Sequence, residues 1–324
     1  MSDTTVELRD DGRSGRRILL HSNQHSTRYD ITSLQGQGGT GRVWIARDLR
    51  LNREVALKEL ISSEPESAQT RFLREARITS QLEHPSIVPV YELDLHQIDG
   101  APYYTMRLIK GDTLREVICR HHSQLIKEVS LGRLVQHFID VCHAIAYAHS
   151  RNIIHRDLKP SNVVVGEFGE TIVLDWGLAK DLGKPRDDAD IANMPTDDGL
   201  DWLTEVEDSD RTQTVVGRSI GTPAFMSPEQ ARGDVDKIDQ SSDIYGLGAI
   251  LYELVTNEPP FKGDKASSII NQVIHGKLLD PLAVNAHAAS PLAAIGTKRT
   301  QKKPAERYAN VDQAIAEMHR YLAD

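Results

Sequence analysis

The chain has 324 residues, of which 39% are hydrophobic and 26% charged, a composition that is typical of a globular protein and excludes a largely disordered chain. No apolar run approaches the roughly 18 residues of a membrane-spanning helix, so nothing in these residues anchors the chain to a membrane, and we expect a cytoplasmic location. The net charge of −9 comes mainly from residues 187–210, which hold ten acidic side chains and neither lysine nor arginine, so it does not describe the rest of the surface.

The chain begins with residues 1–27, which are rich in Ser, Thr, Asp, Arg and His and are expected to form a flexible N-terminal tail. A glycine-rich hairpin follows at residues 36–41, with Val43 just after it. Glycine lacks a Cβ atom, so the backbone of such a hairpin can approach phosphate groups. Because glycine hairpins are common, this pattern alone is a weak signal for a nucleotide site.

A strand and a helix come next. Residues 55–58 alternate in the manner of a strand that ends in Lys58. Residues 71–77 predict a helical segment that contains Glu75. A lone lysine on a strand or a lone glutamate on a helix is usually solvated, so the meaning of this pair depends on the motifs that follow.

The most informative window is residues 155–162 (HRDLKPSN), with Asp175 following thirteen residues after Asn162. Transfer of a γ-phosphoryl group depends on positioning and on neutralising charge. An aspartate can accept the hydrogen bond of the attacking hydroxyl, a lysine can offset charge on the transferring group, and asparagine and aspartate oxygens can bind Mg²⁺. Asp157, Lys159, Asn162 and Asp175 supply these groups in that order.

Together, these motifs resemble those of the eukaryotic-like (Hanks-type) bacterial serine/threonine protein kinases, from about residue 28 to about residue 322. The resemblance implies an α+β, bilobal protein-kinase-like fold with ATP and Mg²⁺ as cofactors. The small lobe, at about residues 28–106, would hold an antiparallel β-sheet and helix αC. The large lobe, at about residues 110–322, would be mainly helical, with ATP in the cleft.

The resemblance also assigns roles to single residues. Asp157 would orient the acceptor hydroxyl and take its proton, Lys159 and Lys58 would offset charge, and Glu75 would pair with Lys58. Asn162 and Asp175 would hold the metal. The residues implied in nucleotide binding, which include the gatekeeper Met106 and the hinge backbone, are Gln35, Gly36, Gln37, Gly38, Gly39, Thr40, Gly41, Val43, Ala56, Lys58, Met106, Arg107, Ile109 and Val164.

Residues 221–229 resemble the end of a kinase activation segment, with Ser227 where the family usually has alanine. Further on, Asp243 resembles the aspartate that anchors the catalytic loop from below. Arg307 resembles the arginine that pairs with the glutamate at position 229. The resemblance gives Asp243, Glu229 and Arg307 structural roles.

The activation segment spans 55 positions, residues 175–229, and is longer than is usual in the family. Its acidic part, at about residues 185–210, is interpreted as an insertion. Like charges and few apolar residues predict a disordered loop. The alternative is an autoinhibitory segment, in which Leu200, Leu203 and Val206 form one face of a short helix that docks while the acids occupy a basic substrate groove.

Two threonines just after the insertion, Thr212 and Thr214, resemble paired phosphothreonine sites. Arg156, which precedes the catalytic aspartate, is the usual partner of a phosphate on the activation segment, because a phosphate adds charge and strong hydrogen-bond acceptors. We therefore expect autophosphorylation at Thr212 and Thr214, with Ser219 as a second candidate.

The two cysteines, Cys119 and Cys142, form no Cys-x-x-Cys pair and are expected to be reduced thiols. Cys142 belongs to an apolar helical stripe and should be buried. Cys119 lies near His121 and His122, but no second half of a zinc site follows, so this cluster is predicted to be a solvated helix end. His155 is given a structural role by the resemblance.

The basic cluster of residues 298–303 is short and predicts a solvated loop, so no nucleic-acid partner is expected. Residues 295–300 are poorer in apolar side chains than the family's corresponding helix, which could loosen the large lobe. Two other departures concern the site: Trp176 replaces phenylalanine beside Asp175, and Gln35 replaces a branched apolar residue that normally covers the adenine.

The expected function is transfer of phosphate from ATP to Ser or Thr of protein substrates, because Lys159 and Thr222 match the serine/threonine-kinase pattern. A pseudokinase that acts as a nucleotide-binding scaffold is the competing interpretation, which the presence of Lys58, Asp157 and Asp175 disfavours. A small-molecule kinase is disfavoured by the activation-segment end at residues 221–229. A homodimer through the small lobes follows from the resemblance alone, and no residue decides it.

Overall fold

The computed structural model describes residues 28–37, 41–61, 66–96, 100–123, 129–183 and 222–323. The predicted tail, residues 38–40 of the hairpin, the acidic insertion, and the candidate phosphorylation sites Thr212, Thr214 and Ser219 all lie outside the described residues. Among the helices of the described part, none is both long enough and apolar enough to cross a lipid bilayer.

The chain divides into two compact units. The smaller unit takes in the described residues up to Ala76 together with Pro89–Leu108. The larger unit takes in Arg77–Val88 and the described residues from Ile109 onward. The last residues of the first helix and the loop after it therefore group with the larger unit, although they precede the final two strands of the smaller one.

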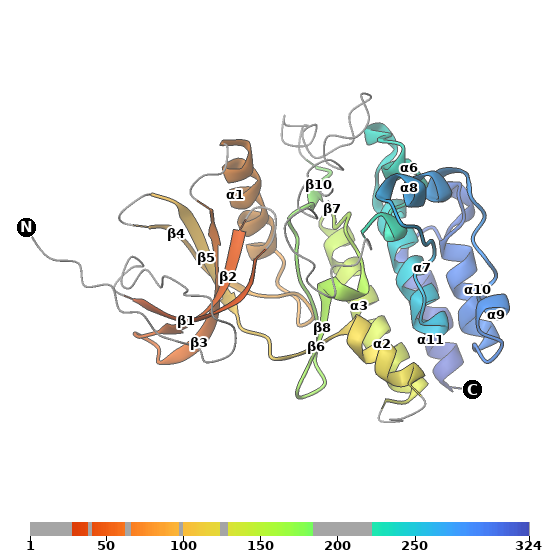
Figure 1. The fold of residues 1–324 in the computed structure, drawn as a ribbon, viewed down its shortest axis with the longest axis horizontal. Helices are drawn as coiled ribbons and strands as arrows, with labels where there is room; N and C mark the ends of the chain where they lie inside the picture. Colours follow the sequence, from red (N-terminus) through yellow and green to blue (C-terminus); the bar gives the residue numbers. More distant parts are fainter. Residues whose placement is uncertain are drawn as a thin grey trace, which may run out of the picture. The chain divides into compact units, whose positions relative to one another are not determined.

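The smaller unit is a five-stranded antiparallel sheet in the order β1-β2-β3-β5-β4, with one helix against it (Figure 1). This confirms the predicted small sheet with its helix. The elements are β1 (Tyr29–Gln37), β2 (Gly41–Asp48), β3 (Arg53–Leu60), α1 (Glu66–Ser80), β4 (Val90–Leu95) and β5 (Pro102–Arg107).

Strand β3 shows how the sequence builds this unit, because its side chains alternate between the two faces of the sheet. Val55 and Leu57 are buried in one apolar cluster, together with Tyr103 of β5. Leu60 belongs to a different cluster, which contains Phe72 of α1. Lys58 is two residues before Leu60, so it lies on the face of the sheet that α1 covers.

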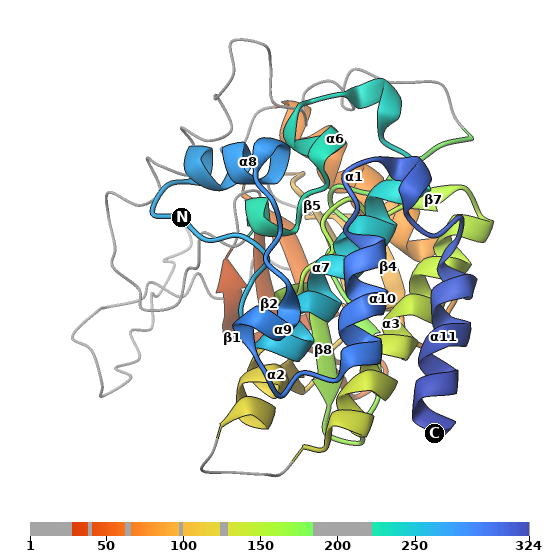
Figure 2. The ribbon, with the colours of Figure 1, turned by 90° about the vertical axis from the view of Figure 1, so that its right-hand side faces the viewer.

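The larger unit is mainly helical, and Figure 2 shows α11 beside α3 and α10 along α7. Helix α7 is its centre, since every residue from Ser242 to Thr256 is buried, the polar Ser242, Asp243, Glu253 and Thr256 included. The helices are α2 (Leu114–His122), α3 (Leu131–Ser150), α6 (Pro228–Ala231), α7 (Gln240–Thr256), α8 (Ala266–His275), α9 (Pro281–Val284), α10 (Ser290–Arg299) and α11 (Val311–Ala323).

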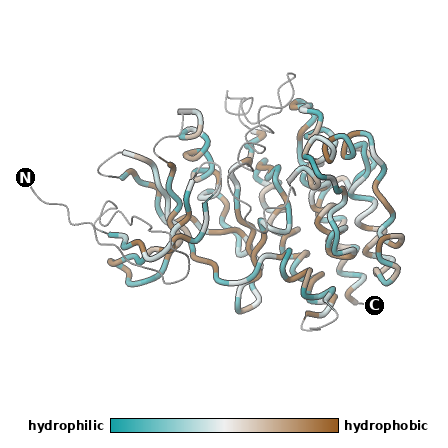
Figure 3. Tube along the Cα trace, viewed as in Figure 1, coloured by the Kyte–Doolittle hydropathy of each residue, from teal (hydrophilic) through white to brown (hydrophobic). Residues whose placement is uncertain are grey.

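Side-chain caps fix where several of these helices begin. Thr113 accepts a hydrogen bond from the backbone N–H of Glu116, and the Glu116 side chain bonds back to the backbone of Thr113, a capping box that starts α2. Ser130 caps α3 by accepting a hydrogen bond from the Arg133 backbone N–H. Along the helices, the tube in Figure 3 alternates between hydrophobic and hydrophilic residues, as expected for elements with one buried face.

Short strands of the larger unit frame the residue window 155–162. Strands β6, β8 and β9 form one small sheet, and β7 pairs with β10 in another. The window begins directly after β7 and ends in the 3₁₀ turn Pro160–Asn162, from which β8 departs. These strands are β6 (Gly111–Thr113), β7 (Ile153–Ile154), β8 (Val163–Gly166), β9 (Thr171–Val173) and β10 (Lys180–Asp181).

Residues 295–300, which we expected to loosen the large lobe, instead pack closely. The helix α10 lies against Gly248 of α7, where a Cβ atom would be 2.6 Å from Arg299 Cβ and 2.8 Å from Thr300 Cγ2. Such distances are too short for carbon atoms, so only glycine at position 248 allows the two helices to come this near. Close approach of the helices therefore offsets the low apolar content of the segment.

The prediction that the basic cluster is a solvated loop was wrong for Arg299, which ends α10 and is 1% exposed. Its Nη1 and Nη2 atoms lie 3.5 and 3.7 Å from Cys142 Sγ. Its guanidinium lies 5.1 Å from the centre of the Phe138 ring. Among the described residues, no carboxylate contacts this guanidinium, and its Nε has no hydrogen-bond partner.

Replacing Arg299 with methionine should leave the free energy of unfolding unchanged or raise it by about 1–4 kcal/mol, because a buried charge without a carboxylate is replaced by an apolar side chain of similar length. Urea denaturation measures this. Lys303, whose side chain is 79% exposed, offers a control, and Lys303→Met should change stability by no more than about 0.5 kcal/mol. A loss of stability of more than about 1 kcal/mol in Arg299→Met would contradict the prediction.

The two cysteines differ in their surroundings. Cys142 is fully buried, as predicted, and burial raises the pKa of its thiol although Arg299 opposes the shift. Cys119 is exposed, but the histidines near it are half-buried, so the predicted solvated helix end is only partly correct. The ring nitrogen Nδ1 of His121 lies 2.7 Å from the carbonyl oxygen of residue 129, and Nε2 of His122 lies 2.9 Å from that of residue 254.

Candidate active site

Lys58 and Glu75 form an ion pair within the smaller unit. Lys58 Nζ lies 2.6 Å from Glu75 Oε1, and the two side chains are 16% and 7% exposed. The pair forms because β3 presents Lys58 to α1, while Ala68, Phe72 and Ala76 are buried on the helix face next to Glu75. The predicted contact between Lys58 and Glu75 is therefore present.

The described arms of the glycine hairpin are antiparallel, and their pairing continues to Gln37 and Arg42. Gly41 approaches the next strand so closely that a Cβ atom would lie 2.7 Å from the Glu59 carbonyl oxygen. Any other residue would clash with this backbone. Gln35 is exposed and Gly36 is half-buried, and both lie near Gln37, the last residue of β1.

The remaining residues implied in nucleotide binding lie in both units. In the smaller unit, Val43 is paired with Lys58, and Ala56 with Met106, across neighbouring strands. The backbone N–H of Arg107 donates to the Pro89 carbonyl oxygen at 3.1 Å. A backbone hydrogen bond between Arg107 and a ligand would therefore be accepted by the Arg107 carbonyl oxygen. Ile109 and Val164 belong to the larger unit.

Asp157 is the centre of the polar cluster in the larger unit. Its Oδ2 accepts hydrogen bonds from Lys159 Nζ at 2.7 Å and from Asn162 Nδ2 at 3.1 Å. The Asn162 amide also donates to the Asp157 carbonyl oxygen at 3.0 Å. Burial raises the pKa of Asp157; Lys159 opposes this shift, and the neighbouring carboxylate of Asp175 adds to it. The carboxylate thus has the surroundings of a group that can accept a proton.

The backbone around Asp157 is held by Asp243 of α7. Asp243 accepts hydrogen bonds from the backbone N–H groups of His155 and Arg156, at 2.8 and 2.9 Å. Burial would raise the pKa of Asp243, but the hydrogen bond and charge of His149 and the nearby His155 bring it below its usual value. Arg156 has a φ of 68°, a strained conformation for a residue other than glycine, and these bonds stabilise it. The predicted anchoring role of Asp243 is confirmed.

Asn162 and Asp175 carry oxygen atoms of the kind that could bind a hard divalent cation. The Asn162 amide nitrogen points to Asp157, so its oxygen is the amide atom that can ligate a metal. Asp175 is exposed, has a φ of 58°, and raises the pKa of Asp157 through the proximity of two like charges. Carboxylate and amide oxygens are the ligands that Mg²⁺ prefers, and a cation would offset this repulsion.

Trp176 keeps a large ring beside Asp175 but brings a polar group with it. The side chain is 1% exposed, and its ring centre lies 4.6 Å from that of His155. His155 in turn lies 3.2 Å from the Leu174 carbonyl oxygen through Nε2, which gives His155 the structural role expected of it. The indole Nε1 is buried and has no hydrogen-bond partner among the described residues.

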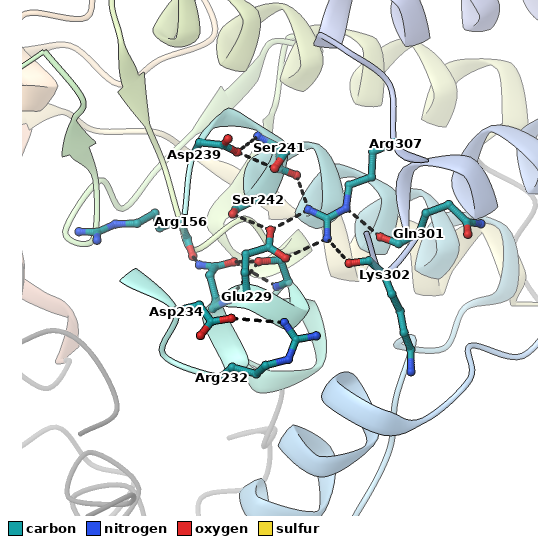
Figure 4. A network of polar contacts seen from close by, with 12 residues as sticks. Arg156, Glu229, Arg232, Asp234, Asp239, Ser241, Ser242, Gln301, Lys302 and Arg307 are labelled. Carbon is teal, nitrogen blue, oxygen red and sulfur yellow. Dashed lines mark hydrogen bonds and ion pairs between the residues drawn. The ribbon is translucent and has the colours of Figure 1, made fainter. Parts of the chain in front are cut away.

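A second buried network ties the end of the activation segment to the C-terminal part of the larger unit (Figure 4). Arg307 donates from Nη1 and Nη2 to the two carboxylate oxygens of Glu229, at 2.7 and 2.9 Å. The predicted pair is therefore confirmed. Further donors and acceptors complete it, namely Ser242 Oγ to Glu229, and Arg307 to the backbone carbonyls of Ser241, Gln301 and Lys302.

Ser227, where alanine is usual, caps helix α6. Its hydroxyl accepts from the Gln230 backbone, and the Gln230 side chain bonds back to Ser227, which completes a capping box. Gln230 Nε2 also donates to the Arg156 carbonyl oxygen at 2.7 Å. The start of α6 is thereby connected to the residue that precedes Asp157.

A family model described as the protein kinase domain matches residues 29–318 of the chain. The chain belongs to the protein kinase domain family. The α+β fold, with a small antiparallel sheet in one unit and a mainly helical second unit, agrees with this membership. Enzymes of this family use ATP, typically with a divalent metal.

Similar curated proteins include serine/threonine-protein kinases of bacteria. The serine/threonine-protein kinase PknD of Protochlamydia amoebophila (strain UWE25) is 36% identical over 305 residues, 91% of this chain and 30% of that protein. The PknD of Chlamydia pneumoniae is 35% identical over 306 residues, 91% of this chain and 31% of the relative. The PknB of Mycobacterium tuberculosis (strain ATCC 25177 / H37Ra) is 34% identical over 302 residues, 92% of this chain and 42% of the relative. The chain spans less than half the length of each relative.

One residue at the Lys58–Glu75 pair was not predicted from the sequence. The Tyr104 hydroxyl donates to Glu75 Oε1 at 2.7 Å. The strand period could have placed Tyr104 on the same face as Met106, two residues further on. The pairing with Lys58 could not be predicted, because it depends on the register between β3 and β5.

Proposed function

We propose that the chain transfers the γ-phosphoryl group of ATP to serine or threonine hydroxyls of proteins. The observation that carries this proposal is the Asp157 carboxylate, held between Lys159 and Asn162 and anchored through its backbone neighbours by Asp243. The similarity to curated serine/threonine-protein kinases supports the acceptor class. Lys159, two residues after Asp157, supports it as well.

Each residue has a task in this reaction. Asp157 orients the acceptor hydroxyl and takes its proton as the bond to phosphorus forms, while Lys159 offsets charge on the transferring group. Lys58, paired with Glu75, contacts the phosphates of ATP. Asn162 and Asp175 would hold Mg²⁺, which, when bound, would neutralise charge on the phosphate oxygens. The residues named above for nucleotide binding would hold the rest of ATP.

The regulatory part of the proposal concerns the activation segment. Arg156 Nε donates to the Leu178 carbonyl oxygen, and a phosphate on Thr212 or Thr214 would be a stronger, charged acceptor for the same guanidinium. Autophosphorylation at these threonines, an autoinhibitory role of the acidic insertion, a flexible tail, a homodimer through the smaller units and a cytoplasmic location stay predictions. No observation favours a pseudokinase, since Lys58, Asp157 and Asp175 are all present.

The test is incorporation of labelled γ-phosphate from Mg·ATP into the chain and into a general protein substrate, with the modified residues mapped by mass spectrometry. We expect label on serine and threonine only, with Thr212 or Thr214 among the sites, and no incorporation when EDTA removes the metal. Binding of ATP without any incorporation, both by the full chain and by a protein lacking residues 187–210, would contradict the proposed activity.

A further inference from the structure

The Lys58–Glu75 pair has a third member, which comes from strand β5. Tyr104 is 3% exposed, and its hydroxyl donates to Glu75 Oε1 at 2.7 Å. The same oxygen accepts from Lys58 Nζ at 2.6 Å. Three elements, β3, α1 and β5, therefore meet at a single carboxylate oxygen.

We propose that the Tyr104 hydroxyl positions Glu75, and through it Lys58, in the arrangement that binds ATP. This inference deepens the proposed kinase activity and rests on it. Tyr104 is a positioning residue, because it contacts Glu75 and Lys58 and acts on ATP through them.

The hydrogen bond from the Tyr104 hydroxyl to Glu75 is stronger than one between two neutral groups. The Glu75 side chain is 7% exposed, and a carboxylate removed from water needs donors to replace those that water supplied. A hydroxyl that donates to a carboxylate forms a charge-assisted hydrogen bond, which is stronger than one between neutral groups. Loss of the hydroxyl would leave this oxygen with one donor fewer in a site that water reaches poorly.

The pairing of β3 with β5 places the Tyr104 side chain next to Glu75 Oε1. Tyr104 is the cross-strand partner of Lys58 in the antiparallel pairing of β3 with β5, so the two side chains leave the same face of the sheet as direct neighbours. The Lys58 ammonium lies 5.8 Å from the centre of the Tyr104 ring. Lys58 and Tyr104 therefore reach Glu75 side by side.

The ring of Tyr104 adds a second contact with the same helix. It packs against the Phe72 ring, with the ring centres 5.2 Å apart and the planes tilted by 47°. Phe72 and Glu75 are three residues apart on α1 and so lie on one helix face. Tyr104 thus contacts α1 at two points, one apolar and one polar. Together with the apolar packing of α1 against the sheet, these two contacts restrict rotation of the helix about its axis.

The substitution Tyr104→Phe separates these two contacts, because it keeps the ring and removes the hydroxyl. The dissociation constant for ATP should rise about tenfold, and kcat/KM for ATP should fall by a similar factor, the usual effect of losing one hydrogen bond to a charged group. Calorimetry and a phosphate-incorporation assay measure the two quantities. Tyr103→Phe is the matched control, since Tyr103 is the neighbouring residue, is 1% exposed and packs in the cluster on the other face of the sheet.

A double-mutant cycle with Glu75→Gln distinguishes positioning from general packing. In the Glu75→Gln protein the charged acceptor is absent, so adding Tyr104→Phe should change ATP affinity by less than about twofold. The same tenfold effect in both backgrounds would overturn the inference, as would a Tyr104→Phe protein that binds ATP as well as the wild type or a Tyr103→Phe protein that is equally impaired.

The binding measurement also keeps the two proposals apart. ATP affinity requires no turnover. If the wild type and the protein lacking residues 187–210 both bound ATP without transferring phosphate, the proposed activity would be contradicted and the Tyr104 cycle could still be measured. A wild type that transfers phosphate, together with a cycle that shows no coupling between Tyr104 and Glu75, would overturn the positioning role alone.

Discussion

Replacing Asp157 with asparagine should lower the rate of phosphoryl transfer by about 10²–10⁴-fold, the range associated with the loss of a positioned proton acceptor. Asparagine is close to aspartate in shape but cannot take the proton of the acceptor hydroxyl. The raised pKa of the Asp157 carboxyl, due first to burial and then moderated by Lys159, marks it as a better base than an exposed aspartate. Initial rates with saturating Mg·ATP and a protein substrate measure the change.

Two controls make this result specific to Asp157. Asp312→Asn on the exposed side of α11 should leave the rate within about twofold of the wild type, since exposed substitutions rarely affect the fold. The Asp157→Asn protein should still bind ATP and should melt near the wild-type temperature. A rate within about tenfold of the wild type would contradict the assignment of Asp157 as proton acceptor.

Replacing Arg307 with methionine should lower the free energy of unfolding by about 3–5 kcal/mol, because it leaves the Glu229 carboxylate buried and without its cation. The side chains of Arg307 and Glu229 are 0% and 2% exposed. The double variant with Glu229→Gln should be less destabilised than Arg307→Met alone, since it buries no unpaired charge. Urea denaturation gives these values, and a loss below about 1 kcal/mol would contradict the expectation.

The same pair predicts a dependence on pH. Burial would raise the pKa of Glu229, but Arg307 and Ser242 bring it below the ordinary glutamate value. In the wild type the ionised pair therefore contributes stability above the unfolded-state pKa, which is lost only as pH falls through the lower folded value. Without Arg307, burial should raise the pKa of the Glu229 carboxyl. As the pH falls, this carboxyl is therefore protonated in the variant before it is in the wild type, which removes the cost of the buried unpaired charge. The stability gap between wild type and Arg307→Met should narrow as the pH falls from about 8 to about 5, and a constant gap would contradict this account.

The contacts that could be predicted from the sequence share one property. Each joins two charged side chains whose positions are set by the order of the motifs. Glu229 pairs with Arg307 in an order of motifs that the family fixes. The Lys58–Glu75 contact follows from a strand and a helix of the same small unit. In each case, charge and motif order were enough to name the partner.

Other contacts could not be predicted, because they depend on packing between elements far apart in the chain. Arg299 lies in a run of basic residues and would be placed in solvent by any rule based on charge. Its burial depends on Gly248, which brings α7 close to α10, and on Cys142 and Phe138 of α3. Tyr104 likewise looks like an ordinary strand residue until the register of β5 against β3 is known. A sequence pattern predicts which face of a helix or strand a side chain lies on. Which residue of another element contacts that side chain depends on the fold.

Trp176 also gives the protein an optical probe beside Asp175. The chain contains three tryptophans, Trp44, Trp176 and Trp202, and only Trp176 adjoins Asp175. Within the part of the chain that the structure describes, its buried indole N–H has no partner, whereas that of Trp44 bonds to Glu59 at 2.8 Å. Movement of the Trp176 ring into water would satisfy its N–H group and shift its emission to longer wavelengths. In a protein with Trp44→Phe and Trp202→Phe, intrinsic fluorescence would therefore follow rearrangement beside Asp175 without any attached label.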